Sequence, residues 1–115
     1  MNELKKIDIQ RAAEALSEYW TPQELALVND HALRVGKIKG DSHTHRHLEG
    51  DEAFIVLKGE IFIQIDGEEL CLKEGQLFVV PRGTTHRPYA PSEALILMFE
   101  PSDLSFSLSE EIMEK

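Results

Sequence analysis

The chain of 115 residues carries a net charge of −9 and has a pI near 4.9. This acidity argues against nucleic acid and against an anionic membrane surface as partners, because both attract basic protein faces. With 42% hydrophobic residues the chain can bury a core, which argues against disorder. Its length fits one domain, so we expect residues 1–115 to form a single domain.

Cysteine content and hydropathy predict where the protein is located. Cys71 is the only cysteine and cannot form an internal disulfide, which is typical of a reducing compartment. The N-terminal residues show no signal peptide, and no stretch approaches the roughly 20 apolar residues of a membrane span. We therefore predict a cytoplasmic protein in which Cys71 packs as a small buried residue on a strand.

The first predicted element is a helix over residues 8–20. Asp8 is a suitable N-cap, and Thr21 and Pro22 would end the helix. Its apolar residues recur at helical spacing: Ile9, Ala12, Ala13, Leu16 and Trp20. We expect this apolar stripe to pack against the rest of the fold or against a partner subunit.

From Glu24 onward the pattern changes to short strands separated by Gly, Pro, Asn and Asp turns. In 61–65, for example, Ile61, Ile63 and Ile65 share one face, and the hairpin signal Asp66-Gly67 follows. The predicted strands are 24–28, 32–39, 53–58, 61–65, 68–73, 77–80, 86–90 and 94–100. Such spacing predicts an all-β sandwich or closed barrel with a core over about residues 24–100.

A further short helix is predicted near the C-terminus. Ser107 and Glu110 have the spacing of a capping box, in which each side chain bonds the other residue's backbone.

The segment between Gly40 and Gly59 contains the residues most typical of a metal site. His45 and His47 stand two residues apart, so on a strand they point to the same side, and the carboxylate of Glu52 follows five residues later. Neutral imidazoles and a carboxylate that converge can bind a divalent transition metal. A further imidazole, His86, lies downstream. The alternatives are a set of unrelated polar residues on strands, or a site that keeps these residues and binds metal weakly.

Two motifs in this chain resemble those of the cupin family. The first is H-x-H, four residues, Glu and six residues before a glycine, and here it ends at Gly59. The second is a glycine, five residues, P-x-G, two residues and a histidine, and it runs from Gly75 to His86. The resemblance covers about residues 32–100. There are two departures: Gly40 stands one residue closer to His45 than the general pattern has it, and Ala90 replaces a frequent asparagine.

The resemblance implies a jelly-roll β-sandwich with a metal ion inside it. The implied ligands are His45, His47, Glu52 and His86. Three imidazoles and one carboxylate suit Fe, Mn, Ni, Co, Cu or Zn better than Ca or Mg, which prefer oxygen ligands. Dimers are common among similar proteins, and apolar residues on both faces of 53–58 also lead us to expect a homodimer.

Several other side chains are expected near the metal. Phe54 and Val56 share the parity of Glu52 and should line a partly apolar cavity, with Gln64 projecting into it, which favours a small organic ligand. His43 shares the parity of His45 and is the candidate catalytic acid or base, with a fifth metal ligand or a rim residue as alternatives. Three basic residues could together bind an anion, or could simply lie on a strand surface: Arg34, Lys37 and Lys39.

Two functions are consistent with these residues. The first is a metal-dependent enzyme acting on a small organic molecule, with dioxygenation or sugar isomerisation as the reactions that the resemblance suggests. The second is a non-catalytic module that binds or senses a metal or a small ligand. The fold itself does not discriminate between them.

Overall fold

The computed structural model describes residues 4–104, which form one helix and seven strands. The elements in chain order are α1 (Ile9–Glu14), β1 (Gln23–Val28), β2 (His31–Gly40), β3 (Glu52–Lys58), β4 (Glu60–Ile65), β5 (Glu68–Lys73), β6 (Leu77–Val80) and β7 (His86–Pro101). The C-terminal helix predicted around Ser107 lies outside the described residues. Within the part that is described, no helix has the length and apolar character needed to cross a membrane.

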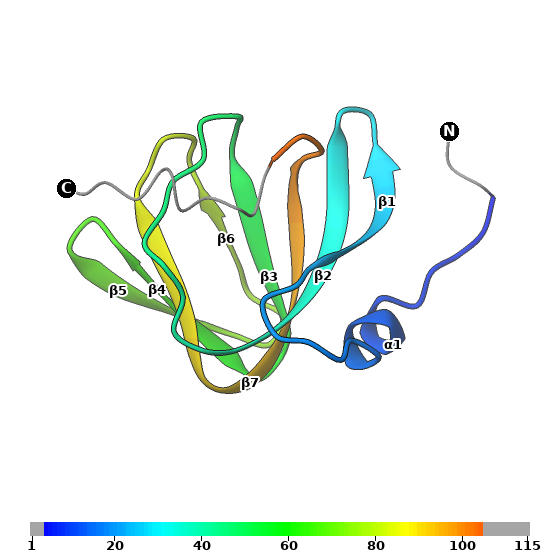
Figure 1. The fold of residues 1–115 in the computed structure, drawn as a ribbon, viewed down its shortest axis with the longest axis horizontal. Helices are drawn as coiled ribbons and strands as arrows, with labels where there is room; N and C mark the ends of the chain where they lie inside the picture. The colour runs from blue at the N-terminus through cyan, green and yellow to red at the C-terminus, as the bar shows by residue number, and fades with distance from the viewer. Residues whose placement is uncertain (1–3, 105–115) are drawn as a thin grey trace.

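The strands form an antiparallel jelly-roll sandwich in which β7 belongs to both sheets (Figure 1). The larger sheet has the order β1-β2-β7-β3-β6, and the smaller one pairs β4 with β5 and with the first part of β7. The sequence predicted two strands, 86–90 and 94–100, where the structure has one long bent strand. Pro91, Ser92 and Glu93 at the bend are exposed, and there the strand passes from the smaller sheet to the larger one.

Gly59, which closes the first motif, is required by the turn between β3 and β4. Its φ angle is 83°, in the left-handed region that favours glycine. A Cβ atom there would also lie 3.0 Å from the backbone oxygen of Glu93 in the bend of β7. The glycine therefore lets two backbone segments approach each other where β7 changes sheets.

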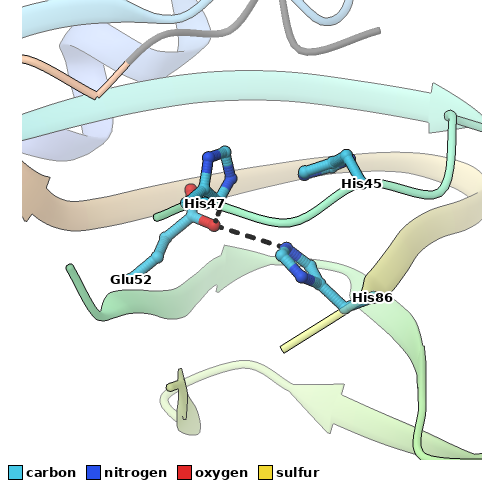
Figure 2. A group of neighbouring side chains, drawn as sticks. All are labelled: His45, His47, Glu52 and His86. Carbon is cyan, nitrogen blue, oxygen red and sulfur yellow. Dashed lines mark ion pairs between the residues drawn. The ribbon is translucent and has the colours of Figure 1, made fainter. Parts of the chain in front are cut away.

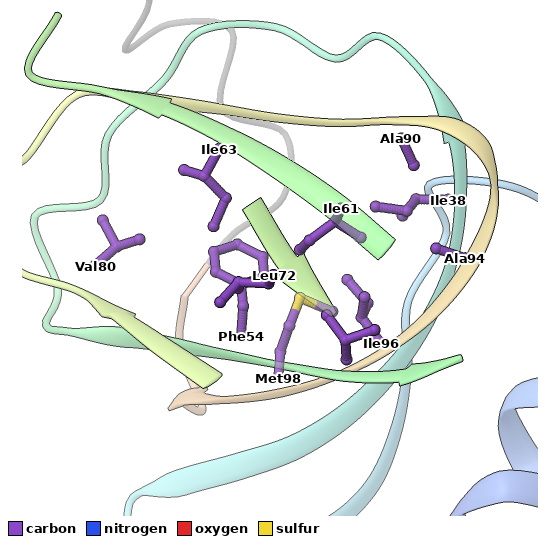
Figure 3. Packing of buried hydrophobic residues seen from close by; sticks show 11 residues of the cluster. Ile38, Phe54, Ile61, Ile63, Leu72, Val80, Ala90, Ala94, Ile96 and Met98 are labelled. Carbon is purple, nitrogen blue, oxygen red and sulfur yellow. The ribbon is translucent and has the colours of Figure 1, made fainter. Parts of the chain in front are cut away.

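Alternating side chains of both sheets fill the space between them (Figure 3). Ile61 and Ile63 of β4 are fully buried, as their alternation predicted. Each buried aliphatic side chain of this size contributes about 1.5–3 kcal/mol to folding. Cys71 has the opposite parity to Leu72 and is exposed, so the prediction that it is buried was wrong.

The N-terminal helix is shorter than predicted, because it ends at Glu14 rather than near residue 20. Trp20 instead has a φ angle of 60° and binds β2. Its backbone N–H donates to the oxygen of Lys37 over 2.9 Å, and its indole Nε1–H donates to the oxygen of Lys39 over 3.0 Å. These bonds hold the chain against the sandwich in a conformation that no helix could continue through.

Helix α1 covers part of the outer face of the larger sheet. Ala13 is fully buried and packs with Val35 of β2 and Leu95 of β7, while Leu57 of β3 adjoins the same cluster. The apolar residues that led us to expect a second subunit are therefore partly covered by the chain's own helix.

Candidate metal centre

The backbone of the loop between β2 and β3 is fastened to the start of β7 next to the histidine motif. The amide of His45 donates to the carbonyl oxygen of His86 over 2.9 Å, and the amide of His86 donates to that of His45 over 2.8 Å. Glu52 begins β3 and His86 begins β7, so each is positioned by a strand of the larger or smaller sheet. This bridge brings together residues that are 41 positions apart.

Four side chains meet at one point inside the sandwich (Figure 2). They are His45, His47, Glu52 and His86, and their nearest ligand atoms all lie within 4.8 Å of one another. The Oε1 atom of Glu52 is 3.2 Å from Nε2 of His47 and 3.5 Å from Nε2 of His86. His47, Glu52 and His86 are buried and His45 is half-buried, so the cluster is sheltered from water.

Backbone carbonyl groups fix the proton on two of the imidazoles. Nδ1 of His45 lies 2.8 Å from the oxygen of His43, and Nδ1 of His86 lies 2.9 Å from the oxygen of Thr84. A carbonyl oxygen can only accept, so each Nδ1 must carry a hydrogen. Both rings are therefore oriented so that Nε2 is the atom left for a metal ion.

The cluster contains buried polar atoms without hydrogen bonds. Among the described residues these include both ring nitrogens of His47, Oε1 of Glu52 and Nε2 of His86. Leaving a buried polar atom unsatisfied costs about 1–3 kcal/mol. One cation shared by His47 Nε2, Glu52 Oε1 and His86 Nε2 would satisfy three of these atoms at once. The donor set therefore fits a divalent metal ion.

The charges of the cluster also suit a cation. Burial, reinforced by the nearby His86, lowers the pKa of His45 from 6.5 to about 4, so this ring is neutral at physiological pH. Burial opposes ionisation of Glu52, but interactions with His47 and His86 outweigh it and lower the pKa of its carboxyl group. The set thus includes a neutral His45 imidazole and an ionised Glu52 carboxylate.

The sequence analysis missed Glu100, a carboxylic acid behind the cluster. Glu100 is fully buried near the end of β7, and its Oε2 accepts a hydrogen bond from Nη1 of Arg34 over 2.8 Å. Burial and hydrogen bonding to Glu52 raise the pKa of Glu100 to about 9, against the opposing effect of Arg34. A protonated Glu100 can donate to Glu52. The available signal was an acidic residue closing the apolar run 94–99.

A cavity of about 440 Å³ opens beside the cluster. His45 and Glu52 contribute to its lining, together with Trp20, Phe54 and Met98. Phe54 thus lies where its parity predicted.

Other residues expected near this cavity have different places. Val56 is buried in the hydrophobic core and does not line the cavity. Gln64 is exposed and its amide bonds to Glu69 over 3.3 Å on the smaller sheet, so its predicted position was wrong. His43 lines the cavity but is exposed and stands outside the four-residue cluster, which matches a rim residue better than a fifth ligand.

The basic residues considered as an anion clamp lie elsewhere. Arg34 pairs with Glu100 and with Glu24 and donates to the backbone oxygen of Ser102. Lys37 and Lys39 belong to β2 but are not among the residues that line the cavity.

Comparison with known proteins identifies one family. Residues 32–100 match the family model described as the cupin domain. A sequence of Bacillus subtilis, the uncharacterized protein YdbB, is 43% identical over 61 residues, which are 52% of this chain and 54% of that protein. An uncharacterized protein of Aquifex aeolicus is 37% identical over 67 residues, 56% of this chain and 55% of that one. The chain thus spans about half the length of the curated relatives it matches.

Solved structures with the same fold cover most of the chain. A cupin-2 domain-containing protein from Shewanella frigidimarina superposes with a TM-score of 0.80 and 30% identity, over 83% of this chain and 93% of that one. Protein NMB1881 from Neisseria meningitidis gives a TM-score of 0.78 at 25% identity, over 85% of this chain and 100% of that one.

Proposed function

The chain belongs to the cupin family, and on this premise we propose that it binds one divalent transition-metal ion and uses it to bind or transform a small organic molecule. The proposed ligands are His45, His47, Glu52 and His86. The observation that carries the proposal is the group of buried donor atoms that lack hydrogen bonds and converge on one point.

The donor set narrows the choice of metal. Three imidazole nitrogens and one carboxylate oxygen suit Fe, Mn, Ni, Co, Cu or Zn, whereas Ca and Mg prefer all-oxygen sets. With one carboxylate and three neutral rings, the loaded centre would carry a net charge of about +1. When bound, such an ion would supply Lewis-acid polarisation of a ligand oxygen, or redox chemistry if it is Fe, Mn or Cu.

The residues of the chain would orient the ligand and move protons. His45 and Glu52 face both the cluster and the cavity, so a molecule in the cavity lies beside the proposed centre. His43 on the cavity rim is the proposed acid or base, because it is an imidazole that lines the cavity without belonging to the four-residue cluster. In this role it would serve an isomerase or an oxygenase.

A non-catalytic binding or sensing module is the second candidate. It is favoured by the scarcity of acid and base groups in the cavity. Apart from His45 and Glu52, the titratable side chains among its described lining residues are His43 and Asp41, and Asp41 is already paired with Arg87.

Metal analysis of purified protein followed by a substrate screen tests the proposal. We expect one metal ion per chain in the wild type and a large loss in His47→Ala, while His31→Ala, a histidine outside the cluster, keeps full metal content. Turnover that disappears with chelator would support an enzyme, and tight ligand binding without turnover would support the module. Equal metal content in the two variants would refute the site.

We also propose a homodimer and a cytoplasmic location. In β6, an outer strand of the larger sheet, Leu77 is 61% exposed and Val79 is 44% exposed, and a second copy would cover them. The lone exposed thiol of Cys71 fits a reducing compartment. Sedimentation that shows only monomer at micromolar concentration would exclude the dimer.

A further inference from the structure

The walls of the cavity beside the proposed metal centre are mainly apolar. Ile38, Phe54, Ile96 and Met98 line it and come from strands of the larger sheet, and each is buried within the core. Its volume of about 440 Å³ lies within the range of small-molecule sites, roughly 300–1,000 Å³. A ligand would therefore exchange water for hydrocarbon over most of its surface.

Trp20 adds an aromatic wall from outside the barrel strands. Its backbone amide and its indole N–H are both bonded to carbonyl groups of β2, so the indole nitrogen is already satisfied. The ring therefore offers its apolar surface to the cavity rather than a free donor. Aromatic rings attract other flat rings beyond the effect of burial alone.

The polar groups at the cavity are largely occupied by the protein itself. Ser42 donates its hydroxyl hydrogen to the backbone oxygen of Pro88, and Thr21 donates to that of Tyr19 over 3.1 Å. Asp41 is paired with Arg87. A polyhydroxylated molecule would lose hydrogen bonds to water here without replacing them.

The described part of the cavity wall carries no cation that could hold a phosphate. None of the described residues lining it is a lysine or an arginine, and the whole chain has a net charge of −9. A loaded metal centre of net charge about +1 could accept one oxygen ligand but would not balance a dianion. A sugar phosphate therefore fits this cavity poorly.

We infer that the site takes a compact, largely apolar molecule with a single oxygen-donor group, of which a phenol is the simplest example. The inference rests on the proposed function, because the oxygen of the ligand is expected to bind the metal ion. The proposed ligands of that ion are His45, His47, Glu52 and His86. The apolar body would lie between Trp20 and the hydrocarbon of Phe54, Ile96 and Met98.

Gly36 is a position from which a side chain could enter the cavity, since an added Cβ atom would make only ordinary contacts. It lies on β2 and lines the cavity, and its φ angle is not in the left-handed region. A Cβ atom there would lie 3.5 Å from Cγ1 of Ile96 and 3.5 Å from Cε of Met98, which are ordinary contacts. Gly36→Leu would extend a side chain into the cavity, and Lys39→Leu places the same side chain on an exposed position of the same strand.

Trp20 is the only tryptophan and reports on the cavity directly. Full-length protein loaded with redox-inactive Zn²⁺ is titrated with phenol and separately with glucose 6-phosphate, while the Trp20 emission and the bound zinc are measured. Calorimetry on the same samples provides a second affinity. We expect saturable quenching by phenol and none by glucose 6-phosphate. Gly36→Leu should weaken phenol binding by about tenfold or more, because even one extra methylene group in a pocket changes affinity by about that factor. Lys39→Leu should leave phenol binding unchanged.

The outcomes separate this inference from the proposed function. Bound zinc with no phenol response, tighter binding of the sugar phosphate, or equal phenol binding by both leucine variants would overturn the apolar ligand class and leave the metal site standing. Phenol quenching that is sensitive to Gly36→Leu in protein without bound zinc would support the cavity while refuting the metal centre. A folded Gly36→Ala variant, which adds one methyl group, gives an intermediate affinity if the cavity is the binding site.

Discussion

The backbones of His45 and His86 are joined by two hydrogen bonds of 2.9 and 2.8 Å. The bridge does not involve their side chains, so the peptide framework holds the two imidazoles together whether or not a metal is bound. Each ring is then oriented by a carbonyl group two residues earlier in the chain, that of His43 or Thr84. The centre is therefore preorganised by the backbone.

Hydrogen exchange tests this preorganisation. In metal-free protein the amides of His45 and His86 should be protected from exchange, because each donates to a backbone oxygen within the fold. Exchange of both amides at the rate of an unstructured peptide would show instead that metal binding creates the bridge.

Removing Glu100 should destabilise the protein strongly. Glu100→Ala removes a buried carboxyl group that accepts a hydrogen bond from Arg34, and losing a buried hydrogen-bond partner costs about 1–3 kcal/mol. Glu24→Ala removes the exposed partner of the same arginine and should cost less than about 1 kcal/mol. Urea denaturation measures both. Equal losses in the two variants would contradict the buried role of Glu100.

Alanine substitutions at Gly59 and Gly67 distinguish the cost of backbone strain from the cost of a steric contact. Both have positive φ angles, 83° and 74°, so alanine at either position should cost about 1–2 kcal/mol. Only at Gly59 would the added Cβ atom also meet a backbone oxygen, that of Glu93, at 3.0 Å. Gly59→Ala should therefore lower the free energy of unfolding more than Gly67→Ala, and the reverse order would show that the bend of β7 does not need the glycine.

The stability of the metal-free protein should depend on pH through His45. Its pKa falls from 6.5 to about 4 on folding, mainly through burial and secondly through His86. Between these two pH values the unfolded chain binds a proton at His45 and the folded chain does not. Stability is thus complete above pH 6.5 and is lost as the pH falls toward about 4. Thermal unfolding of chelator-treated protein across this window should show a steeper slope in the wild type than in His45→Gln. Identical slopes would assign the effect to other groups.

Much of the fold was predictable because it depends on local patterns. The alternation at Ile61 and Ile63 reflects burial of one strand face, and the motif spacing marked the residues that meet in the cluster. Trp20 was assigned to a helix on its spacing, but bonds to β2 hold it elsewhere.

The missed role of Glu100 and the continuity of β7 depend on contacts between distant strands, whereas the error at Cys71 is local. Glu100 looked like the end of an apolar strand, since its partners Arg34 and Glu52 are remote in sequence. Cys71 was expected to be buried because cysteine is a small hydrophobic residue. Its parity, opposite to that of Leu72, places it on the exposed side of β5. No local pattern could show that the bend of β7 keeps two predicted strands continuous.

Three buried side chains and the half-buried His45 are proposed to bind one divalent ion. The most direct measurement is a calorimetric titration of chelator-stripped protein with Zn²⁺, repeated with Glu52→Gln, which keeps the volume of the side chain but removes its charge. We predict one ion bound per wild-type chain and an affinity at least about tenfold lower in the variant, since charge and donor strength both fall. A wild type that binds no Zn²⁺, or a variant that binds it equally well, would contradict the account.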